Sequence, residues 1–185
     1  MPRTRIVVTI GPATTADAAV ADCIEAGASV FRLNFSHGTH EEHGKRIDQI
    51  RRLAAGRPVA ILADLCGPKL RLVHPVRGKP GDVVAITLPG SVRAGDPVLL
   101  ADGIMQLEVV DPGHARVIVG GDIPVGKGIN LPSSRLDDVP SLTDKDRDDM
   151  RFAVGKGVDF IGLSFVRSPR DLEEPASFRN PESPR

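Results

Sequence analysis

The chain has 185 residues, of which 41% are hydrophobic and 26% are charged, with 24 basic and 24 acidic side chains. This composition is typical of a globular protein, and the balanced charge excludes a broad electrostatic attraction to nucleic acid or to an anionic membrane. The two cysteines, Cys23 and Cys66, are far apart and indicate neither a disulfide framework nor a zinc motif. Because no signal-like start or membrane-length apolar run is visible, we expect a cytoplasmic protein.

The first third of the chain alternates between strand and helix patterns. Apolar runs typical of buried strands lie over 5–11, 28–35 and 59–63. Between them, apolar residues recur at helical spacing over 19–24, and Thr39 with Glu42 forms the capping-box pattern that begins a second helix. Continuous apolar strands separated by helices favour a parallel sheet covered by helices, so the fold class is α/β.

The pattern changes at Gly67-Pro68, where a segment rich in glycine and proline begins. Its candidate strands are 83–88, 98–100, 106–110 and 116–119, with a hairpin turn expected over 111–114. This indicates a small all-β domain inserted into the α/β body. We therefore predict a body over 1–67 and 138–174 and an inserted domain over 68–137.

The last part of the chain returns to the α/β pattern. Thr143 and Asp146 predict the start of a helix, and a fourth buried strand is expected over 158–165. Ser168-Pro169 predicts a further helix start, which Pro175 should cut short, since a proline inside a helix removes a hydrogen bond. The segment 175–185 is rich in proline and serine and is expected to be disordered.

The strand over 28–37 carries the most informative polar pattern. Arg32, Asn34 and Ser36 fall on one face of a strand, because side chains alternate with a period of two. A guanidinium, an amide and a hydroxyl together suit a bound anion with a cation beside it, although an ordinary amphipathic strand explains the same pattern. Asp64 and Arg71 follow the third strand and would join Arg32 at the carboxyl ends of the sheet. The alternative for Arg71 is a surface salt bridge.

Other candidate residues are weaker. His37, His40 and His43 could suggest a metal site, but their spacing drifts around a helix and favours solvent-facing histidines. Lys127 lies between two glycines and is a candidate phosphate contact, although the full phosphate-loop pattern is absent.

Six motifs in chain order resemble those of the pyruvate kinase family. They are Thr9-Ile-Gly-Pro12, Arg32-Leu-Asn-Phe-Ser-His-Gly38, Asp64-Leu-Cys-Gly-Pro-Lys69, Lys127-Gly-Ile-Asn-Leu-Pro132, Leu142-Thr-Asp-Lys-Asp146 and Asp159-Phe-Ile-Gly-Leu-Ser-Phe-Val-Arg167. The resemblance extends from Thr4 to about Leu172. It implies a (β/α)8 TIM-type barrel, interrupted after its third strand by a β-barrel lid domain, of which this chain would hold the first four βα units as a partial barrel.

The resemblance also implies roles for particular residues. Arg32 matches the arginine that contacts the substrate phosphoryl group. The potassium ligands match Asn34, Ser36, Asp64 and the backbone carbonyl of Leu65, and the nucleotide positions match Asn34, His37, Arg71 and Lys127. The implied reaction is the glycolytic transfer of a phosphoryl group from phosphoenolpyruvate to ADP, giving pyruvate and ATP, with K⁺ and Mg²⁺ as cofactors.

The match does not extend to every part of the family's active site. The following family segment carries a phosphoryl-stabilising lysine, the carboxylates that hold Mg²⁺ and a threonine near the proton-transfer site, and none has a counterpart here. We therefore expect this chain to be an inactive, marginally stable partial barrel that associates with itself or with a complementary chain. The alternatives are a non-catalytic module that binds phosphate ligands or a full-length homologue, and a truncated gene product without a function of its own.

Overall fold

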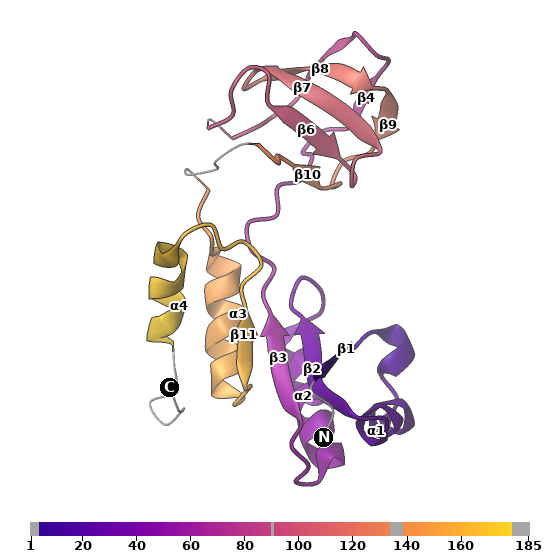
Figure 1. Ribbon diagram of the computed structural model, residues 1–185, viewed down its shortest axis with the longest axis vertical. Coiled ribbons are helices and arrows are strands. Elements are labelled where there is room, and N and C mark those ends of the chain that lie inside the picture. The colour runs from indigo at the N-terminus through magenta and orange to yellow at the C-terminus, as the bar shows by residue number, and fades with distance from the viewer. Residues whose placement is uncertain (1–3, 90, 134–138, 179–185) are drawn as a thin grey trace. The chain divides into compact units, whose positions relative to one another are not determined.

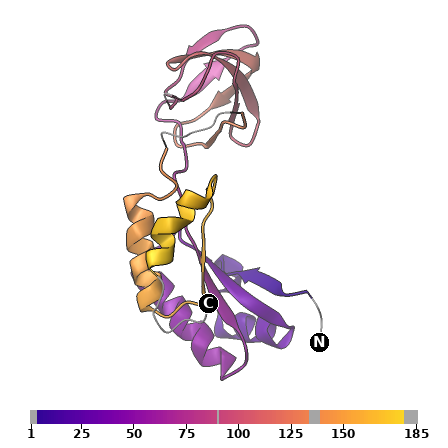
Figure 2. The same cartoon turned by 60° about the vertical axis from the view of Figure 1, so that its left-hand side comes forward.

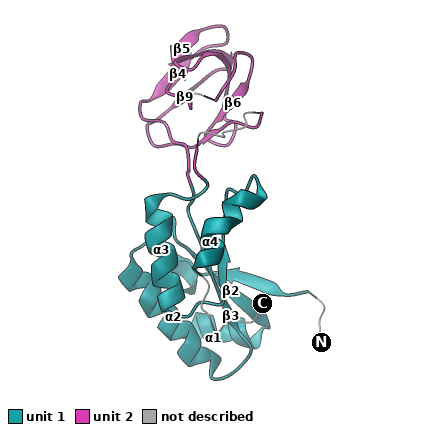
Figure 3. Cartoon of the chain, turned by 90° about the vertical axis from the view of Figure 1, so that its left-hand side faces the viewer, with its two compact units in different colours: residues 1–67, 141–185 teal, residues 68–140 magenta. Residues whose placement is uncertain are grey.

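A computed structural model describes residues 4–89, 91–133 and 139–178 and separates the chain into two compact units (Figures 1 and 3). Unit 1 consists of residues 1–67 and 141–185, and unit 2 of residues 68–140. Residue 138, where the sequence placed the return to the body, lies outside the described residues. Within the described ranges, no helix combines the length and apolarity that crossing a bilayer requires.

Unit 1 is built on a parallel four-stranded sheet with the order β1-β2-β3-β11. The strands are β1 (Ile6–Thr9), β2 (Ala28–Asn34), β3 (Ala60–Asp64) and β11 (Phe160–Gly162). The helices are α1 (Asp17–Glu25), α2 (His40–Ala54), α3 (Asp144–Gly155) and α4 (Glu173–Ser177), with short 3₁₀ helices at η1 (Pro12–Thr14) and η2 (Pro169–Leu172). The order of strands and helices is that of an α/β protein.

The helices cover one face of this sheet (Figures 1 and 2). Phe31 and Leu33 of β2 and Ile61 of β3 are almost fully buried there, together with Ile47 and Ile50 of α2. The opposite face, which we call the open face, carries the alternate residues of each strand. These are Val7, Thr9, Val30, Arg32, Asn34, Ala60, Leu62, Asp64, Phe160 and Gly162.

Both predicted capping boxes in unit 1 are confirmed. The Thr39 hydroxyl accepts from the Glu42 backbone N–H at 3.2 Å, and the Glu42 carboxylate accepts from the Thr39 N–H at 2.7 Å. Thr143 and Asp146 repeat the arrangement at the start of α3. These reciprocal bonds satisfy first-turn N–H groups that have no acceptor within the helix.

The end of unit 1 differs from the sequence-based expectation. Instead of ending a helix and beginning a disordered tail, Pro175 is the third residue of α4. Proline is tolerated there because the first-turn N–H groups of a helix have no intrahelical acceptor to lose. Arg147 of α3 pairs with Glu174 of α4 at 2.6 Å and connects the two helices. The rest of the predicted tail, 179–185, lies outside the described residues.

Unit 2 consists of strands and turns. A five-stranded antiparallel sheet has the order β10-β6-β7-β8-β5, and β4 pairs with β9 separately. The strands are β4 (Val76–Gly78), β5 (Val83–Ala85), β6 (Pro97–Leu100), β7 (Met105–Asp111), β8 (His114–Val119), β9 (Gly121–Ile123) and β10 (Ile129–Asn130). Val76 and Ile123 from the two-stranded pair are buried in the same core as Val98, Leu107 and Val117 from the large sheet. The two sheets therefore enclose one hydrophobic core.

Candidate functional site

The carboxyl ends of three neighbouring strands bring polar side chains together on the open face. Thr9 of β1 is paired in register with Arg32 of β2, and Asn34 of β2 is paired with Asp64 of β3. Since paired residues of parallel strands project from the same face, these four side chains form one polar cluster. The carboxyl end of a parallel sheet is where α/β proteins place their binding sites.

An ion pair between Arg32 and Asp64 is the centre of this cluster. The Arg32 Nε and Nη2 groups both donate to Asp64 Oδ2, at 2.8 and 2.5 Å, and Nη1 donates to Thr9 Oγ1 at 3.0 Å. A guanidinium has five N–H groups, so three engaged donors leave two for a ligand. The Arg32 side chain is 33% exposed, and those two donors are therefore accessible to an anion.

The Ser164 hydroxyl lies next to the carboxylate of Asp64. The Ser164 hydroxyl donates to the Leu65 carbonyl at 2.8 Å and lies 3.3 Å from Asp64 Oδ1. The Leu65 N–H in turn donates to the Gly162 carbonyl of β11 at 3.0 Å. The sequence assigned no role to Ser164, and its only signal was its position at the polar end of the predicted fourth strand. The structure shows that it fixes the chain just after β3.

The segment after β2 forms a tight turn. The Asn34 side-chain oxygen accepts from the Ser36 N–H at 3.0 Å, and the His37 N–H donates to the Asn34 carbonyl at 3.3 Å. The Phe35 N–H donates to the Asp64 carbonyl at 2.9 Å, which connects the turn to β3. Asn34 and Ser36 thereby lie beside the ends of both strands.

The potassium positions implied by the resemblance form an all-oxygen donor set: an amide, a hydroxyl, a carboxylate and a backbone carbonyl. They belong to Asn34, Ser36, Asp64 and Leu65, all in unit 1. Such donors suit a hard cation, and carbonyl oxygens in particular replace the hydration shell of K⁺. Within the described part of the chain, no three His, Cys, Asp or Glu side chains lie within metal-binding reach of one another.

Arg71 and Lys127 belong to unit 2, where they lie on adjacent segments. Arg71 forms an isolated antiparallel bridge with Gly128, and its Nη1 donates to the Gly126 carbonyl at 2.8 Å. Both basic side chains are exposed. The salt bridge considered for Arg71 is replaced by a bond to a backbone carbonyl, which leaves its positive charge available to an anion.

The three histidines diverge. His37 is exposed in the turn, while His40 Nε2 lies 2.7 Å from Asp149 Oδ1 of α3. His43 is buried, and its Nε2 lies 2.8 Å from the His37 carbonyl. Burial lowers the pKa of His43 below its ordinary value. The expectation of solvent-facing histidines is therefore wrong for His43.

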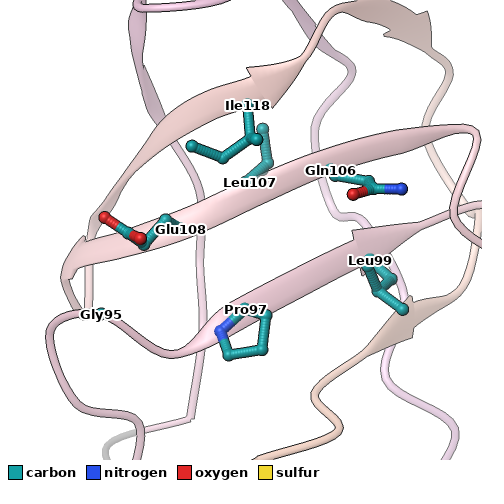
Figure 4. A pocket seen from close by; sticks show the side chains of 7 residues that line it. All are labelled: Gly95, Pro97, Leu99, Gln106, Leu107, Glu108 and Ile118. Atoms are coloured by element: carbon teal, nitrogen blue, oxygen red, sulfur yellow. The ribbon is translucent and has the colours of Figure 1, made fainter.

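Unit 2 contains a small hollow that is lined by other residues than those predicted for the site. Its volume is about 140 Å³, and Figure 4 shows it over β6, β7 and β8. It is lined by Gly95, Pro97, Leu99, Gln106, Leu107, Glu108 and Ile118. None of the predicted site residues lines it, so it has no place in the candidate site.

Comparisons with known proteins agree on one family. The family described as pyruvate kinase, barrel domain, matches residues 1–87 and 82–183. Pyruvate kinase 2 of Synechocystis is 41% identical over 203 aligned residues, and pyruvate kinase of Staphylococcus aureus is 39% identical. The alignments cover 93% and 94% of this chain.

A solved structure gives the same result. The crystal structure of a pyruvate kinase from Cryptosporidium parvum is similar to this chain with a TM-score of 0.88 and 34% identity, and the match covers 95% of this chain and 41% of that one. The chain spans about a third, 34%, of the length of the two curated relatives. With a matching family description over most of its residues, the chain belongs to the pyruvate kinase family.

Proposed function

We propose that unit 1 supplies the phosphoryl-binding and potassium-binding part of a pyruvate kinase active site. The reaction is the transfer of a phosphoryl group from phosphoenolpyruvate to ADP. The observation that carries the proposal is Arg32, which is held by Asp64 and Thr9 at the carboxyl end of the sheet with two N–H groups left for an anion. We propose that unit 1 corresponds to the first four βα units of the family's (β/α)8 barrel and that unit 2 corresponds to its inserted β-barrel lid.

Positioning and charge neutralisation are what phosphoryl transfer requires of a protein. Asp64 and Thr9 fix the guanidinium of Arg32, so that little side-chain entropy remains to be lost when a phosphoryl group binds. A K⁺ ion would be held by the oxygens of Asn34, Ser36, Asp64 and Leu65. Bound there, the ion would supply one positive charge that offsets the negative charge of the phosphoryl group.

The charge balance of the cluster predicts cooperative binding. The carboxylate of Asp64 is already neutralised by Arg32, so a cation alone gains little attraction from the pair. A bound phosphoryl anion adds the missing negative charge. K⁺ and the anion should therefore each increase the affinity for the other by the same factor.

We propose His37 and Asn34 as candidate nucleotide contacts within unit 1, and Arg71 and Lys127 as candidate nucleotide contacts within unit 2. The two basic side chains are exposed and suit the phosphates of ADP or ATP. We propose no step through Mg²⁺, because no residue of this chain matches the family's divalent-metal ligands. We propose that a chain of these 185 residues has no significant turnover on its own, because those carboxylates and the family's phosphoryl-stabilising lysine have no counterpart in it.

Two measurements test the proposal. Calorimetry with phosphoenolpyruvate in KCl should show binding that weakens in Arg32→Ala by about 10- to 100-fold, as for loss of a charge-assisted bond. The matched control is Arg5→Ala, an exposed arginine ahead of β1, which should bind as the unaltered chain does. Equal binding by the unaltered chain and Arg32→Ala contradicts the assignment of Arg32. A lactate dehydrogenase-coupled assay that detects turnover abolished by Arg32→Ala contradicts the proposed inactivity.

A second candidate function is association with a complementary or full-length chain. The observation that favours it is the open face, where Val7 and Phe160 are 52% and 55% exposed. Co-expression with a complete pyruvate kinase, followed by purification through a tag on this chain, tests it. Recovery of the complete enzyme that is lost in Phe160→Ser supports docking through this face, and recovery of this chain alone contradicts it.

A further inference from the structure

Two side chains, one from α2 and one from α3, contact backbone carbonyls of the turn after β2. Lys145 Nζ of α3 donates to the Phe35 carbonyl at 2.8 Å, and His43 Nε2 of α2 lies 2.8 Å from the His37 carbonyl. Ser36, one of the proposed potassium ligands, lies between these two fixed carbonyls. The path of the turn is thus determined by α2 and α3 as well as by β2.

His43 is built into the core rather than placed on the surface. Its residue is 9% exposed, and its ring stacks on the Phe35 ring with centroids 4.0 Å apart and planes at 14°. Because a carbonyl only accepts hydrogen bonds, the ring must carry its proton on Nε2. Gly38, with φ of +81°, fits closely over it, and a Cβ there would lie 3.3 Å from His43 Nε2.

We propose that His43 is a positioning residue that fixes the His37 carbonyl and so orients Ser36 and His37 for the cation and the nucleotide. This inference rests on the proposed function for what the turn binds. The hydrogen bond itself and its effect on the turn stand independently of that function.

A second set of contacts fixes Lys145, whose ammonium group donates to the Phe35 carbonyl of the turn. Asp149 is 3% exposed, and its carboxylate accepts from Lys145 Nζ at 2.5 Å and contacts His40 Nε2 at 2.7 Å. The His40 ring stacks on Phe152 with centroids 4.4 Å apart. The groups that interact electrostatically with the His43 ring are His40 on its own helix, Lys145 and Asp149 from α3, and the His37 carbonyl.

Two substitutions separate the hydrogen bond from the stacking. His43→Phe keeps a ring against Phe35 and loses the donor, whereas His43→Gln keeps an N–H donor and loses the ring. The readout is amide hydrogen exchange, measured by NMR, at Ser36 and His37, whose N–H groups bond within the turn. We expect exchange at these amides to accelerate by about 2- to 10-fold in His43→Phe, the value of one neutral hydrogen bond, and less in His43→Gln.

Exchange at Phe31 and Ile61, paired residues of β2 and β3 in unit 1, serves as the internal control for folding. If His43→Phe leaves exchange at Ser36 and His37 unchanged, or if His43→Gln accelerates it as much as His43→Phe, the proposal is overturned. If His43→Phe does not fold, the comparison of His43→Gln with the unaltered chain decides. Near-normal exchange at Ser36 and His37 in His43→Gln then supports the proposal, and accelerated exchange overturns it.

Binding of ADP in KCl, followed by calorimetry on the same samples, gives the functional readout. Weakening by about 2- to 10-fold in His43→Phe, with recovery in His43→Gln, supports orientation of the ligand groups by His43. If the unaltered chain binds neither ADP nor phosphoenolpyruvate, the proposed function fails while accelerated exchange in His43→Phe still supports the positioning role. If the unaltered chain binds ADP and His43→Phe binds it equally well, the positioning role for the ligand is overturned.

Discussion

The two units bury the apolar faces of their sheets in different ways. Unit 2 encloses one core between its five-stranded sheet and the β4–β9 pair, with hairpins such as β7–β8 formed by neighbouring segments. Unit 1 buries one face of a parallel sheet under helices and leaves polar and apolar side chains on the open face. The comparison teaches that Arg32, Asn34 and Asp64, which are proposed for phosphoryl and potassium binding, lie on the face of the sheet that contributes least to the core.

The largest expected effects on stability come from substitutions of buried residues in the two cores. These substitutions also test whether the two units unfold independently. Phe31, fully buried in unit 1, and Leu107, 2% exposed in unit 2, are matched positions. Phe31→Ala should destabilise unit 1 by about 3–5 kcal/mol and Leu107→Ala should destabilise unit 2 by about 2–5 kcal/mol. Urea unfolding followed by NMR resonances from each unit checks this. Simultaneous loss of both units in either variant would show that they are not independent.

The connection between the units gives the next effect. Asp146 is fully buried, and its carboxylate accepts from Gly67 N–H at 3.0 Å, just before unit 2, and from Thr143 N–H at 2.8 Å, just after it. Asp146→Ala leaves these donors without their acceptor and should cost unit 1 about 2–3 kcal/mol. Asp144→Ala, two residues away with a fully exposed carboxylate, is the control and should have little effect. A loss confined to unit 2 would contradict this assignment.

Local sequence patterns predicted much of unit 1. The capping boxes at Thr39 and Thr143 are confirmed because their bonds join residues three apart. The alternation also indicated correctly that Arg32 and Asn34 share a face, since period two is a property of the strand itself. It was wrong for Ser36, which lies in the turn after β2 ends. The convergence of Arg32 with Asp64 followed from the parallel order of the strands.

What the sequence could not predict depends on distant contacts. Strands β4, β9 and β10 contain only two or three residues, and each is defined by pairing with a remote segment. The burial of His43 depends on Phe35, brought close by the packing of α2 on the sheet. Ser164 likewise acquires its contacts only when β11 lies beside β3. The local sequence periodicity around these strands, His43 and Ser164 does not indicate which distant segments they contact.

A smaller difference between the units is expected in their response to pH. Because burial lowers the pKa of His43, the unfolded chain binds that proton more readily, and unit 1 should lose stability as pH falls below about 6.5. In unit 2, the Gly113 N–H and His114 lower the pKa of Asp111, so that contribution is present above about 3.8 and is lost only as pH falls further. Unfolding of each unit between pH 7.5 and 3 measures both.

The variant His43→Phe is the control for this difference. It should remove the part of the pH dependence of unit 1 that begins as pH falls below about 6.5 and leave unit 2 unchanged. If unit 1 of His43→Phe loses stability over that range as steeply as the unaltered chain, His43 is not the responsible group.

The smallest effect on stability should come from the open face itself. Phe160 is 55% exposed and is paired in register with Leu62, so its ring projects from the face opposite the helices. Phe160→Ser should change the stability of unit 1 by less than about 0.5–1 kcal/mol, as for other surface positions, yet reduce self-association of the chain. Sedimentation velocity over a concentration series measures the association.

Ile104→Ser, at a position 69% exposed in unit 2, is the matched control and should leave self-association unchanged. Equal effects of the two substitutions would mean that exposed apolar area in general drives association. An effect confined to Phe160→Ser would place the interface on the open face, beside Arg32 and the proposed binding residues, where a second chain would compete with ligand.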